Sequence, residues 1–330
     1  MDRKRLLVVG AGAMGSMYSQ LVAAGRVPEA ELAGIVDTDG ARALELASTL
    51  GCPAFGDIEA AVRQARPDAA YVATPDHLHR QPVEALAAAG IAILVEKPLA
   101  TTVEDARAMT EAVERAGVHA EVNYGLRWHP AFQEARRAIE SGEVGEVRTL
   151  SARMNAPITL PRDRLRWSGR TSPAWYLMSH LLDLTFWLVG RHAESVYASG
   201  SRGTLAAGGL GTLDSVRAIV RYRGGIDAGF ESVWILPASW PTAAETSLRV
   251  VGSEGVLEAD ASHQGVLIAG QHLRQPASTA WYAARLSAFL RSIDGLGQTR
   301  VTFHDGLETT RILAALDRSL QSGRAERVEP

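Results

Sequence analysis

The stretch LLVVGAGAMG, residues 6–15, decides the fold of the first half of the chain. Its apolar residues predict a buried strand, and Gly10, Gly12 and Gly15 follow in the spacing G-x-G-x-x-G before a helical segment. Glycines at such a turn let backbone N–H groups reach a pyrophosphate at the helix N-terminus. Asp37 ends the next predicted strand, where it can accept hydrogen bonds from a ribose diol, and a turn chosen only for packing would leave it unexplained. We therefore predict a dinucleotide site that includes Gly10, Gly12, Ala13, Met14, Gly15 and Asp37.

Asp37 also predicts which dinucleotide binds. Its carboxylate would repel the 2′-phosphate of NADP, so NAD is favoured as the cofactor and NADP is less favoured. Arg42 follows within a predicted helix that could direct it away from Asp37.

Apolar runs and helical segments alternate regularly over residues 5–123. Strands that are apolar throughout and separated by helices indicate a parallel sheet covered on both faces. We therefore predict a doubly wound α/β domain, with strands at 5–10, 31–37, 69–74, 91–96 and 119–123.

After residue 123 the pattern changes, so we predict two domains, 1–123 and 124–330. The second is expected to be an α+β domain, in which helix 129–142 and strand 147–155 precede one long apolar helix at 174–190. Alternating runs then indicate a large, mostly antiparallel open sheet arranged as a meander. Two helices close the chain, and the tail 322–330 is expected to fray. The predicted meander strands are 195–201, 215–223, 226–235, 246–252 and 255–260, and the closing helices are 279–293 and 305–321.

The composition excludes several classes of function. The 330 residues carry a formal net charge of −3, so nucleic acid is not an expected partner. No apolar run approaches the ~20 residues that span a bilayer, so no membrane partner is expected either. The single cysteine, Cys52, excludes a disulfide within the chain and a cysteine metal cluster. We expect a cytoplasmic protein without a metal site.

Polar residues follow the strand 69–74 at the carboxyl edge of the sheet, where parallel sheets bind ligands. We expect Thr74 and Pro75 to line the nicotinamide side, with His79 near the cofactor. A direct role at the substrate is one option for His77 and His79. The alternative is that they only begin the next helix.

The stretch LVEKPL, residues 94–99, brings Glu96, Lys97 and Pro98 to the same edge. A lysine beside a nicotinamide can hydrogen-bond a substrate oxygen and move its proton, because partial burial lowers its pKa. Pro98 would stiffen the turn, with a cis bond as one option. Glu96 could orient Lys97 or contact the ribose, and the alternative for Lys97 is an ordinary surface residue.

Three polar side chains of the apolar helix predicted at 174–190 are candidates for a functional site. His180 and Asp183 are three residues apart and share a face, as do Tyr176 and His180, four apart. Polar groups on a buried helix are hydrogen-bonded or functional. The alternative to a catalytic role is therefore that His180 and Asp183 hydrogen-bond each other within the core.

These motifs together resemble the glucose–fructose oxidoreductase, inositol dehydrogenase and MocA family. The resemblance covers nearly the whole chain: VVGAGAMG, VDTD at 36–39, YVATPDHLH, VEKPL, RWHPAF and SGEVGEV within 127–147, HLLDLTFWLVG and VVGSEGVLE at 250–258. It implies a Rossmann domain followed by a domain with an open sheet, and NAD(P)-dependent hydride transfer at a hydroxyl or keto carbon of a sugar, polyol or sugar derivative. It also implies subunits that pair through their sheets, as a homodimer or homotetramer.

Carried over by position, the resemblance makes Lys97 the catalytic lysine and His180 the proton-transfer residue. Asp183 would bind substrate or hold His180, and Arg127 and Trp167 are further substrate candidates. The family's dehydrogenases often carry an aspartate where this chain has Tyr176, which puts inositol-type oxidation in doubt and makes Tyr176 a candidate catalytic hydrogen-bond donor.

Two alternatives remain open at this point. The segment 161–172 holds four arginines and Trp167, which suits an anionic substrate and an imine or keto-sugar reductase, or else is a solvated loop. The other alternative is a non-catalytic NAD(P)-binding sensor, which the presence of Lys97 and His180 disfavours.

Overall fold

The computed structural model describes residues 3–262, 268–269, 273–274, 280–297 and 301–329, and divides the chain into two compact units. One unit comprises Met1–Trp128 and Thr279–Thr310, and the other His129–Ser278 and Arg311–Pro330. The first segment thus ends at Trp128 instead of residue 123, and a later segment, assigned from sequence to the second domain, belongs to the first unit.

The first unit is built on a six-stranded parallel sheet in the order β3-β2-β1-β4-β5-β6. This order is typical of dinucleotide-binding folds, and it reverses beside β1, where such sheets bind their ligand. The predicted doubly wound sheet is therefore confirmed. The strands are β1 (Lys4–Val9), β2 (Ala30–Val36), β3 (Ala54–Phe55), β4 (Ala69–Val72), β5 (Ala92–Val95) and β6 (Ala120–Val122).

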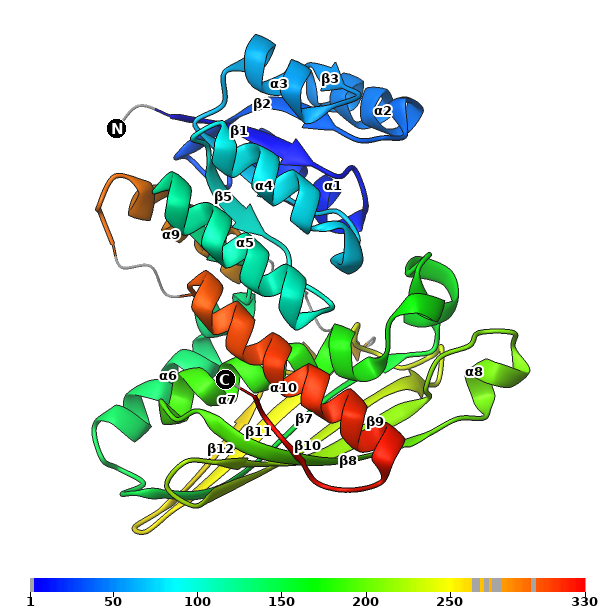
Figure 1. Cartoon of the computed structure of the whole chain (residues 1–330), viewed down its shortest axis with the longest axis vertical. Helices are drawn as coiled ribbons and strands as arrows, with labels where there is room; N and C mark the ends of the chain where they lie inside the picture. The colour runs from blue at the N-terminus through cyan, green and yellow to red at the C-terminus, as the bar shows by residue number, and fades with distance from the viewer. Residues whose placement is uncertain (1–2, 263–267, 270–272, 275–279, 298–300, 330) are drawn as a thin grey trace. The chain divides into compact units, whose positions relative to one another are not determined.

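Helices cover both faces of this sheet: α4 and α5 lie side by side on one face (Figure 1), and α1 and α2 pack on the other. Alternate residues of β1 enter different core clusters: Leu7 and Val9 pack in one, Leu6 and Val8 in the other. Burial on both faces explains why the strands are apolar throughout. The helices are α1 (Ala13–Ala23), α2 (Gly40–Leu50), α3 (Ile58–Ala65), α4 (Arg80–Ala88) and α5 (Val103–Ala116), with short 3₁₀ turns at Asp76–Leu78 and Gly125–Trp128.

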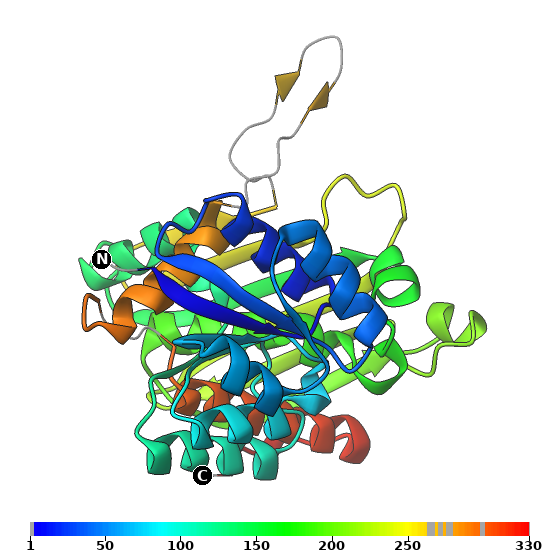
Figure 2. The same ribbon diagram turned by 90° about the horizontal axis from the view of Figure 1, so that it is seen from above.

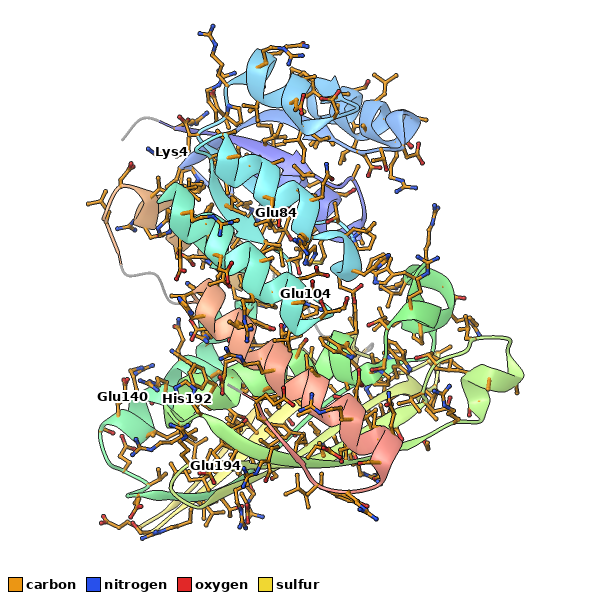
Figure 3. The ribbon with its side chains drawn as sticks, in the orientation of Figure 1. Lys4, Glu84, Glu104, Glu140, His192 and Glu194 are labelled. Carbon is orange, nitrogen blue, oxygen red and sulfur yellow. The ribbon has the colours of Figure 1, made fainter. Side chains whose placement is uncertain are left out.

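Helix α9 (Ala280–Ile293) returns to the first unit and lies beside α1 (Figure 2). Leu286, Phe289 and Leu290 belong to the same core cluster as β1 and α1. The ammonium group of Lys4, labelled in Figure 3, lies 2.6 Å from the carboxylate of Asp294, just after α9. These contacts place α9 in the first unit. The spacing of apolar residues in its sequence indicates that one face of the helix is apolar, but does not indicate which of the two sheets that face covers.

The second unit contains a seven-stranded sheet in the order β12-β11-β7-β10-β9-β8-β15. Strand β7 lies between β11 and β10, parallel to β10 and antiparallel to β11. The expected mostly antiparallel sheet is confirmed, but the simple meander is wrong, because β7 separates β10 from β11. The strands are β7 (Val147–Pro157), β8 (Ala193–Ser201), β9 (Ser215–Tyr222), β10 (Ile226–Leu236), β11 (Glu245–Gly252), β12 (Val256–Asp260) and β15 (Glu326–Arg327), and β13 (Ile268–Ala269) pairs with β14 (Leu273–Arg274).

The chain's tail does not fray as expected. Strand β15 pairs antiparallel with β8, with Glu326 opposite Val196 and Arg327 opposite Ser195. An edge strand of the sheet offers unpaired backbone groups, which explains why a polar segment without an apolar pattern becomes ordered there.

The long apolar helix expected at 174–190 has two parts. Residues Ala174–Met178 form a π-helical turn, in which the Ser179 amide donates to the Ala174 carbonyl, and α7 (Ser179–Val189) follows. A second π turn, Leu160–Arg164, precedes a 3₁₀ turn at Ser168–Arg170. Such turns are rare, and apolar periodicity does not distinguish them from α-helix.

One face of the second sheet is covered by helices and the other is exposed (Figure 1). In β9, the residues at even positions are buried, whereas Arg217, Ile219 and Arg221 are exposed. The remaining helices are α6 (Pro130–Glu140), the short α8 (Thr204–Ala207) and α10 (Phe303–Ser322), whose residues are divided between the two units. Among the helices of the described residues, none has the length and apolar character needed to cross a membrane.

Candidate cofactor site and catalytic residues

The turn after β1 has the geometry of a phosphate-binding turn. Gly10 has φ +103°, and a Cβ there would lie 2.7 Å from the Ala73 carbonyl oxygen. A Cβ on Gly15 would lie 1.8 Å from the Gly10 carbonyl oxygen, so only glycine fits either position. Beside Gly12, in contrast, a Cβ would meet nothing within 4 Å. The turn is therefore closely packed at Gly10 and Gly15, but the space beside Gly12, at the beginning of α1, is open.

The first turn of α1 has no side-chain cap, because Gly12 is its N-cap residue. The N–H groups of a helix's first turn have no partner within the helix and carry its positive dipole end. This open, uncapped terminus is formed by Gly12, Ala13 and Met14, and it suits the binding of a pyrophosphate.

Asp37 is joined to this turn by hydrogen bonds. Its two carboxylate oxygens accept from the amides of Ala11 and Asp39, each at 2.8 Å. The guanidinium of Arg42 points back toward this carboxylate, with Nη1 3.8 Å from Asp37 Oδ2 and Nη2 3.0 Å from Asp39 Oδ2. The direction of Arg42, open at the level of the sequence, is therefore toward Asp37, because Arg42 lies in the first turn of α2.

His79 connects the turns that follow β4 and β5. Its ring is buried, with Nδ1 3.0 Å from the Pro98 carbonyl oxygen and Nε2 3.1 Å from that of Thr74. Burial lowers the pKa of His79, although hydrogen bonds to backbone carbonyls oppose the effect. Thr74 and Pro75 are half-buried just after β4, and their place on the nicotinamide side stays a prediction, whereas His79 faces protein carbonyl groups. Its contact with a cofactor stays a prediction.

Lys97 follows β5 at the same edge, and the Lys97–Pro98 peptide bond is cis. Burial lowers the pKa of the Lys97 amine, while the charges of Glu96 and Asp76 oppose this. The lowered pKa expected from the sequence is therefore present. The Glu96 side chain is buried, and its Oε2 accepts from the Lys97 amide at 3.2 Å. Of the two roles considered for Glu96, this geometry favours the orientation of Lys97.

The second unit holds the other group of candidates. Tyr176 lies in the π turn, half-buried, with its ring 6.4 Å from that of Trp234. His180 and Asp183 lie on α7, where His180 is half-buried and Asp183 is fully buried. The π turn and α7 thus carry all three residues on one continuous helical segment.

Of the other substrate candidates, Arg127 is buried and Trp167 is half-buried. Arg127 belongs to the first unit and is buried, with Nη2 3.5 Å from Asp305 Oδ1. Trp167 packs against the core cluster around Trp234, and its indole N–H is buried without a hydrogen-bond partner in the part of the chain that the structure describes. A buried donor of this kind is one that a ligand can satisfy.

Tyr71 and Asn123 contact Glu96 and were not singled out from the sequence. Tyr71 lies in an apolar strand, where an aromatic residue reads as core. Asn123 carried a usable signal, because a polar residue directly after a buried strand stands at the same edge as Lys97. The described residues include no group of His, Cys, Asp and Glu side chains that could hold a metal ion.

The fold and the open glycine turn define the class of the protein, a dinucleotide-binding protein. Residues 4–124 match the model of GFO_IDH_MocA, the oxidoreductase family with an NAD-binding Rossmann fold, and residues 132–258 match the GFO/IDH/MocA C-terminal domain. The chain belongs to the Gfo/Idh/MocA family of oxidoreductases. The predicted family and the NAD cofactor are confirmed.

Named relatives resemble nearly the whole chain. It is 30% identical over 328 residues to 1,5-anhydro-D-fructose reductase of Ensifer adhaerens, which covers 94% of each chain. It is also 30% identical to myo-inositol dehydrogenase Hyg17 of Streptomyces leeuwenhoekii, over 96% of this chain and 97% of the relative. Because these relatives are dehydrogenases and reductases, the prediction of an enzyme is confirmed over that of a sensor.

Solved structures show the same fold. The crystal structure of GenD2 from gentamicin A biosynthesis, in complex with NAD, superposes with a TM-score of 0.89 at 22% identity. That superposition covers 100% of this chain and 97% of GenD2.

Proposed function

We propose that this enzyme transfers a hydride between NAD and a hydroxyl-bearing or keto carbon of a sugar, polyol or sugar derivative. The observation that carries the proposal is the pairing, in one unit, of an open α1 N-terminus with a lysine of lowered pKa at the carboxyl edge of the same sheet. The relatives named above, a reductase of an anhydro sugar and a dehydrogenase of an inositol, support this substrate class.

The residues of the first unit are proposed to hold the cofactor and to move a proton. NAD, when bound, supplies or takes up the hydride. The amides that follow Gly12 would bind its pyrophosphate, and Asp37 would accept from the ribose hydroxyls. Lys97 would hydrogen-bond the substrate oxygen and exchange its proton, since burial, which lowers its pKa, favours the neutral amine that can accept a proton. Further cofactor contacts are proposed for Gly10, Ala13, Met14, Gly15, Thr74, Pro75, His79 and Glu96.

The residues of α7 and the preceding π turn are proposed to complete the chemistry. His180 is the second proton-transfer candidate, and Tyr176 is a hydrogen-bond donor where the resembling dehydrogenases carry an aspartate. Asp183, Arg127 and Trp167 are proposed substrate contacts.

A screen of substrates tests the proposal. Sugars, inositols, other polyols and keto sugars are incubated with NAD or NADH, and absorbance at the NADH band is followed. Turnover of at least one such compound, abolished in Lys97→Met, is expected. Turnover confined to compounds without a hydroxyl or keto group would contradict the proposal.

An anionic substrate is the second candidate. Arg164, Arg166 and Arg170 are exposed, whereas Arg162 pairs with Asp163 at 2.8 Å, and the charge of Arg164 also acts on that carboxylate. Together with the buried N–H of Trp167, they suit a carboxylate or phosphate on a keto sugar or imine. Phosphorylated and carboxylated analogues therefore belong in the screen, and Arg166→Ala should raise KM for these alone.

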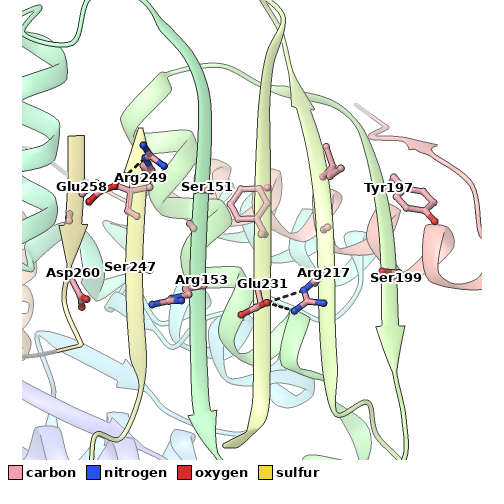
Figure 4. A pocket seen from close by; sticks show the side chains of 17 residues that line it. Ser151, Arg153, Tyr197, Ser199, Arg217, Glu231, Ser247, Arg249, Glu258 and Asp260 are labelled. Carbon is pink, nitrogen blue, oxygen red and sulfur yellow. Dashed lines mark hydrogen bonds and ion pairs between the residues drawn. The ribbon is translucent and has the colours of Figure 1, made fainter. Parts of the chain in front are cut away.

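We also propose that the exposed face of the second sheet pairs with a second copy of the chain. This face is hollowed, and ion pairs cross its strands, as Figure 4 shows for Arg217 and Glu231, 2.7 Å apart. Tyr197 and Ile219 are exposed on it, at 46% and 56%. Apolar side chains on a broad concave face are typical of interfaces.

Light scattering at micromolar concentration tests this pairing. The native chain should have the mass of a dimer or tetramer, and Ile219→Glu should reduce it. Leu44→Glu, which alters an exposed leucine of α2, is the matched control. A monomeric native chain would exclude the pairing. A cytoplasmic location, expected from the single cysteine, remains part of the proposal.

A further inference from the structure

A buried carboxylate lies directly before Lys97 in the chain. Glu96 is 6% exposed, and three donors converge on it. The Lys97 amide donates to Oε2 at 3.2 Å, whereas the Asn123 amide, at 2.6 Å, and the Tyr71 hydroxyl donate to Oε1. Three donors without an opposing acceptor suit an ionised carboxylate, which would be costly to bury without them.

These donors come from separate elements of the first unit. Tyr71 lies on β4 and Asn123 follows β6, while Glu96 follows β5 between them. The Asn123 amide also lies 3.0 Å from the hydroxyl of Tyr18 on α1, and the rings of Tyr18 and Tyr71 are 4.5 Å apart. The network therefore joins the carboxyl ends of three neighbouring strands to the helix of the glycine turn.

The charge on Glu96 affects the groups around it. Burial, and then Glu96, raise the pKa of Tyr71 well above its usual range, so this phenol stays protonated and can donate. The same two causes raise the pKa of Tyr282, on α9, to about 12. At Lys97 the two causes oppose each other, because burial lowers the pKa of the amine while Glu96 and Asp76 raise it.

We propose that Tyr71 and Asn123 are positioning residues, which fix the ionised Glu96 carboxylate beside Lys97 and so set the protonation state of the Lys97 amine. Packing alone would explain why the tyrosine rings are buried. It would not explain why two side-chain donors meet on one oxygen of the carboxylate next to Lys97. The link to catalysis rests on the proposed function, in which Lys97 moves the substrate's proton.

The composition of the chain allows a direct measurement. Lys4 and Lys97 are its only lysines, so protein labelled with ¹³C-lysine gives two ε-carbon signals. The variant Lys4→Arg assigns them, and the signal of Lys4 is an internal control in every sample. The titration midpoint of Lys97 is then followed against pH without cofactor or substrate.

Glu96→Gln should lower the midpoint of Lys97 by roughly one pH unit, because an opposite charge nearby favours the charged amine. Tyr71→Phe, which keeps the ring, and Asn123→Leu should lower it by less. Because these residues act through Glu96, adding Tyr71→Phe to Glu96→Gln should cause no further shift. Asp76→Asn should lower the midpoint independently, so its effect should add to that of Tyr71→Phe.

Controls separate this inference from the proposed function. Tyr222→Phe removes another buried tyrosine hydroxyl, in the second unit, and should leave the midpoint unchanged. An unchanged midpoint in Tyr71→Phe, or an equal shift with and without Glu96→Gln, would overturn the inference. Full turnover by Lys97→Met would instead overturn the proposed function and leave the titration results standing. If the inference and the proposed function both hold, the limb of the pH–rate profile that is due to Lys97 should shift in each variant together with the measured titration midpoint of Lys97.

Discussion

The carboxylate of Asp37 accepts a hydrogen bond from the amide of Ala11 at 2.8 Å. Ala11 lies between the first two glycines of the phosphate-binding turn, so the proposed ribose contact is fixed to the turn itself. This bond keeps the negative charge at the end of β2, where it would meet the adenosine ribose.

Asp37→Ser should narrow the preference for NAD over NADP. The substitution removes the carboxylate, which would repel a 2′-phosphate and accept hydrogen bonds from the ribose hydroxyls. It leaves the guanidinium of Arg42 close by. Loss of a hydrogen bond to a charged group costs about 1.5–3 kcal/mol, so NAD should bind at least about tenfold more weakly. Calorimetric titration of both cofactors measures this. Asp57→Ser, which alters the N-cap of α3, is the control, and tighter binding of NADP than NAD by the native protein would refute the assignment.

Lys97→Met should abolish most turnover and leave NAD affinity within a few-fold of the native value. Methionine keeps the length and the apolar stem but has no amine, and general acid–base groups typically supply ~10²–10⁴ in rate. Steady-state kinetics and cofactor titration on the same preparation separate the two effects. Retention of more than about a tenth of native turnover would show that Lys97 does not move the proton.

The local part of the architecture could be predicted from the sequence. The turn after β1 and the apolar strands are set by neighbouring residues, so their pattern is visible along the chain. The place of β7 between β10 and β11 depends on pairing between segments far apart in sequence. The spacing of apolar residues within one segment does not indicate which other strand that segment pairs with. The same holds for α9, whose apolar face fits either sheet.

The candidate site divides in the same way. Lys97 and Asp37 stand at strand ends and could be found by that position alone. Tyr71 could not, because its ring lies within an apolar strand and only its hydroxyl, aimed at Glu96, distinguishes it from core. The direction of Arg42 required the start of α2 at Gly40, and helix boundaries are the least certain feature of a sequence pattern.

Arg285→Met should strongly destabilise the first unit. The guanidinium of Arg285 lies 2.9 Å from the Glu121 carboxylate and 4.3 Å above the ring of Trp128, and both charged side chains are almost fully buried. Burial alone would raise the pKa of Glu121, but Arg285 and hydrogen bonds from His119 and Ser292 lower it. Removal of one partner from a buried pair costs about 3–5 kcal/mol, because the other charge is left unpaired.

Denaturant unfolding measures this cost. The double variant Glu121→Gln/Arg285→Met should recover part of it, since no buried charge then remains. Arg115→Met, which breaks an exposed pair with Glu111 on α5 of the same unit, should cost about 1 kcal/mol or less. Equal costs for Arg285→Met and Arg115→Met would mean that the buried pair contributes no more than a surface one.

Asp317→Asn should make the second unit's stability less dependent on pH. Burial raises the pKa of Asp317, although the indole of Trp175 donates to it at 2.8 Å and lowers the pKa in part. A carboxyl with a raised pKa favours the folded state when protonated, so its contribution is present at low pH and lost as the pH rises through the folded value. The native chain should therefore lose stability relative to the variant from about pH 4 upward. Thermal midpoints of both proteins across this range measure the difference, and parallel curves would contradict it.

Tyr176→Phe should reduce kcat/KM on the best substrate by about two- to tenfold, the effect of losing one hydrogen bond worth about 0.5–1.5 kcal/mol. The structure leaves room for a rival explanation, because the ring packs near Trp234 at the edge of a core cluster and could serve packing alone. The phenylalanine variant separates the two, since it keeps the ring and its contacts and loses only the hydroxyl. Under the packing explanation its kinetics match those of the native enzyme, whereas Tyr176→Asp lowers the thermal midpoint by placing a charge against the cluster. Under the catalytic explanation Tyr176→Asp restores the carboxylate of the resembling dehydrogenases and should raise activity on inositols, an increase that loss of packing cannot produce.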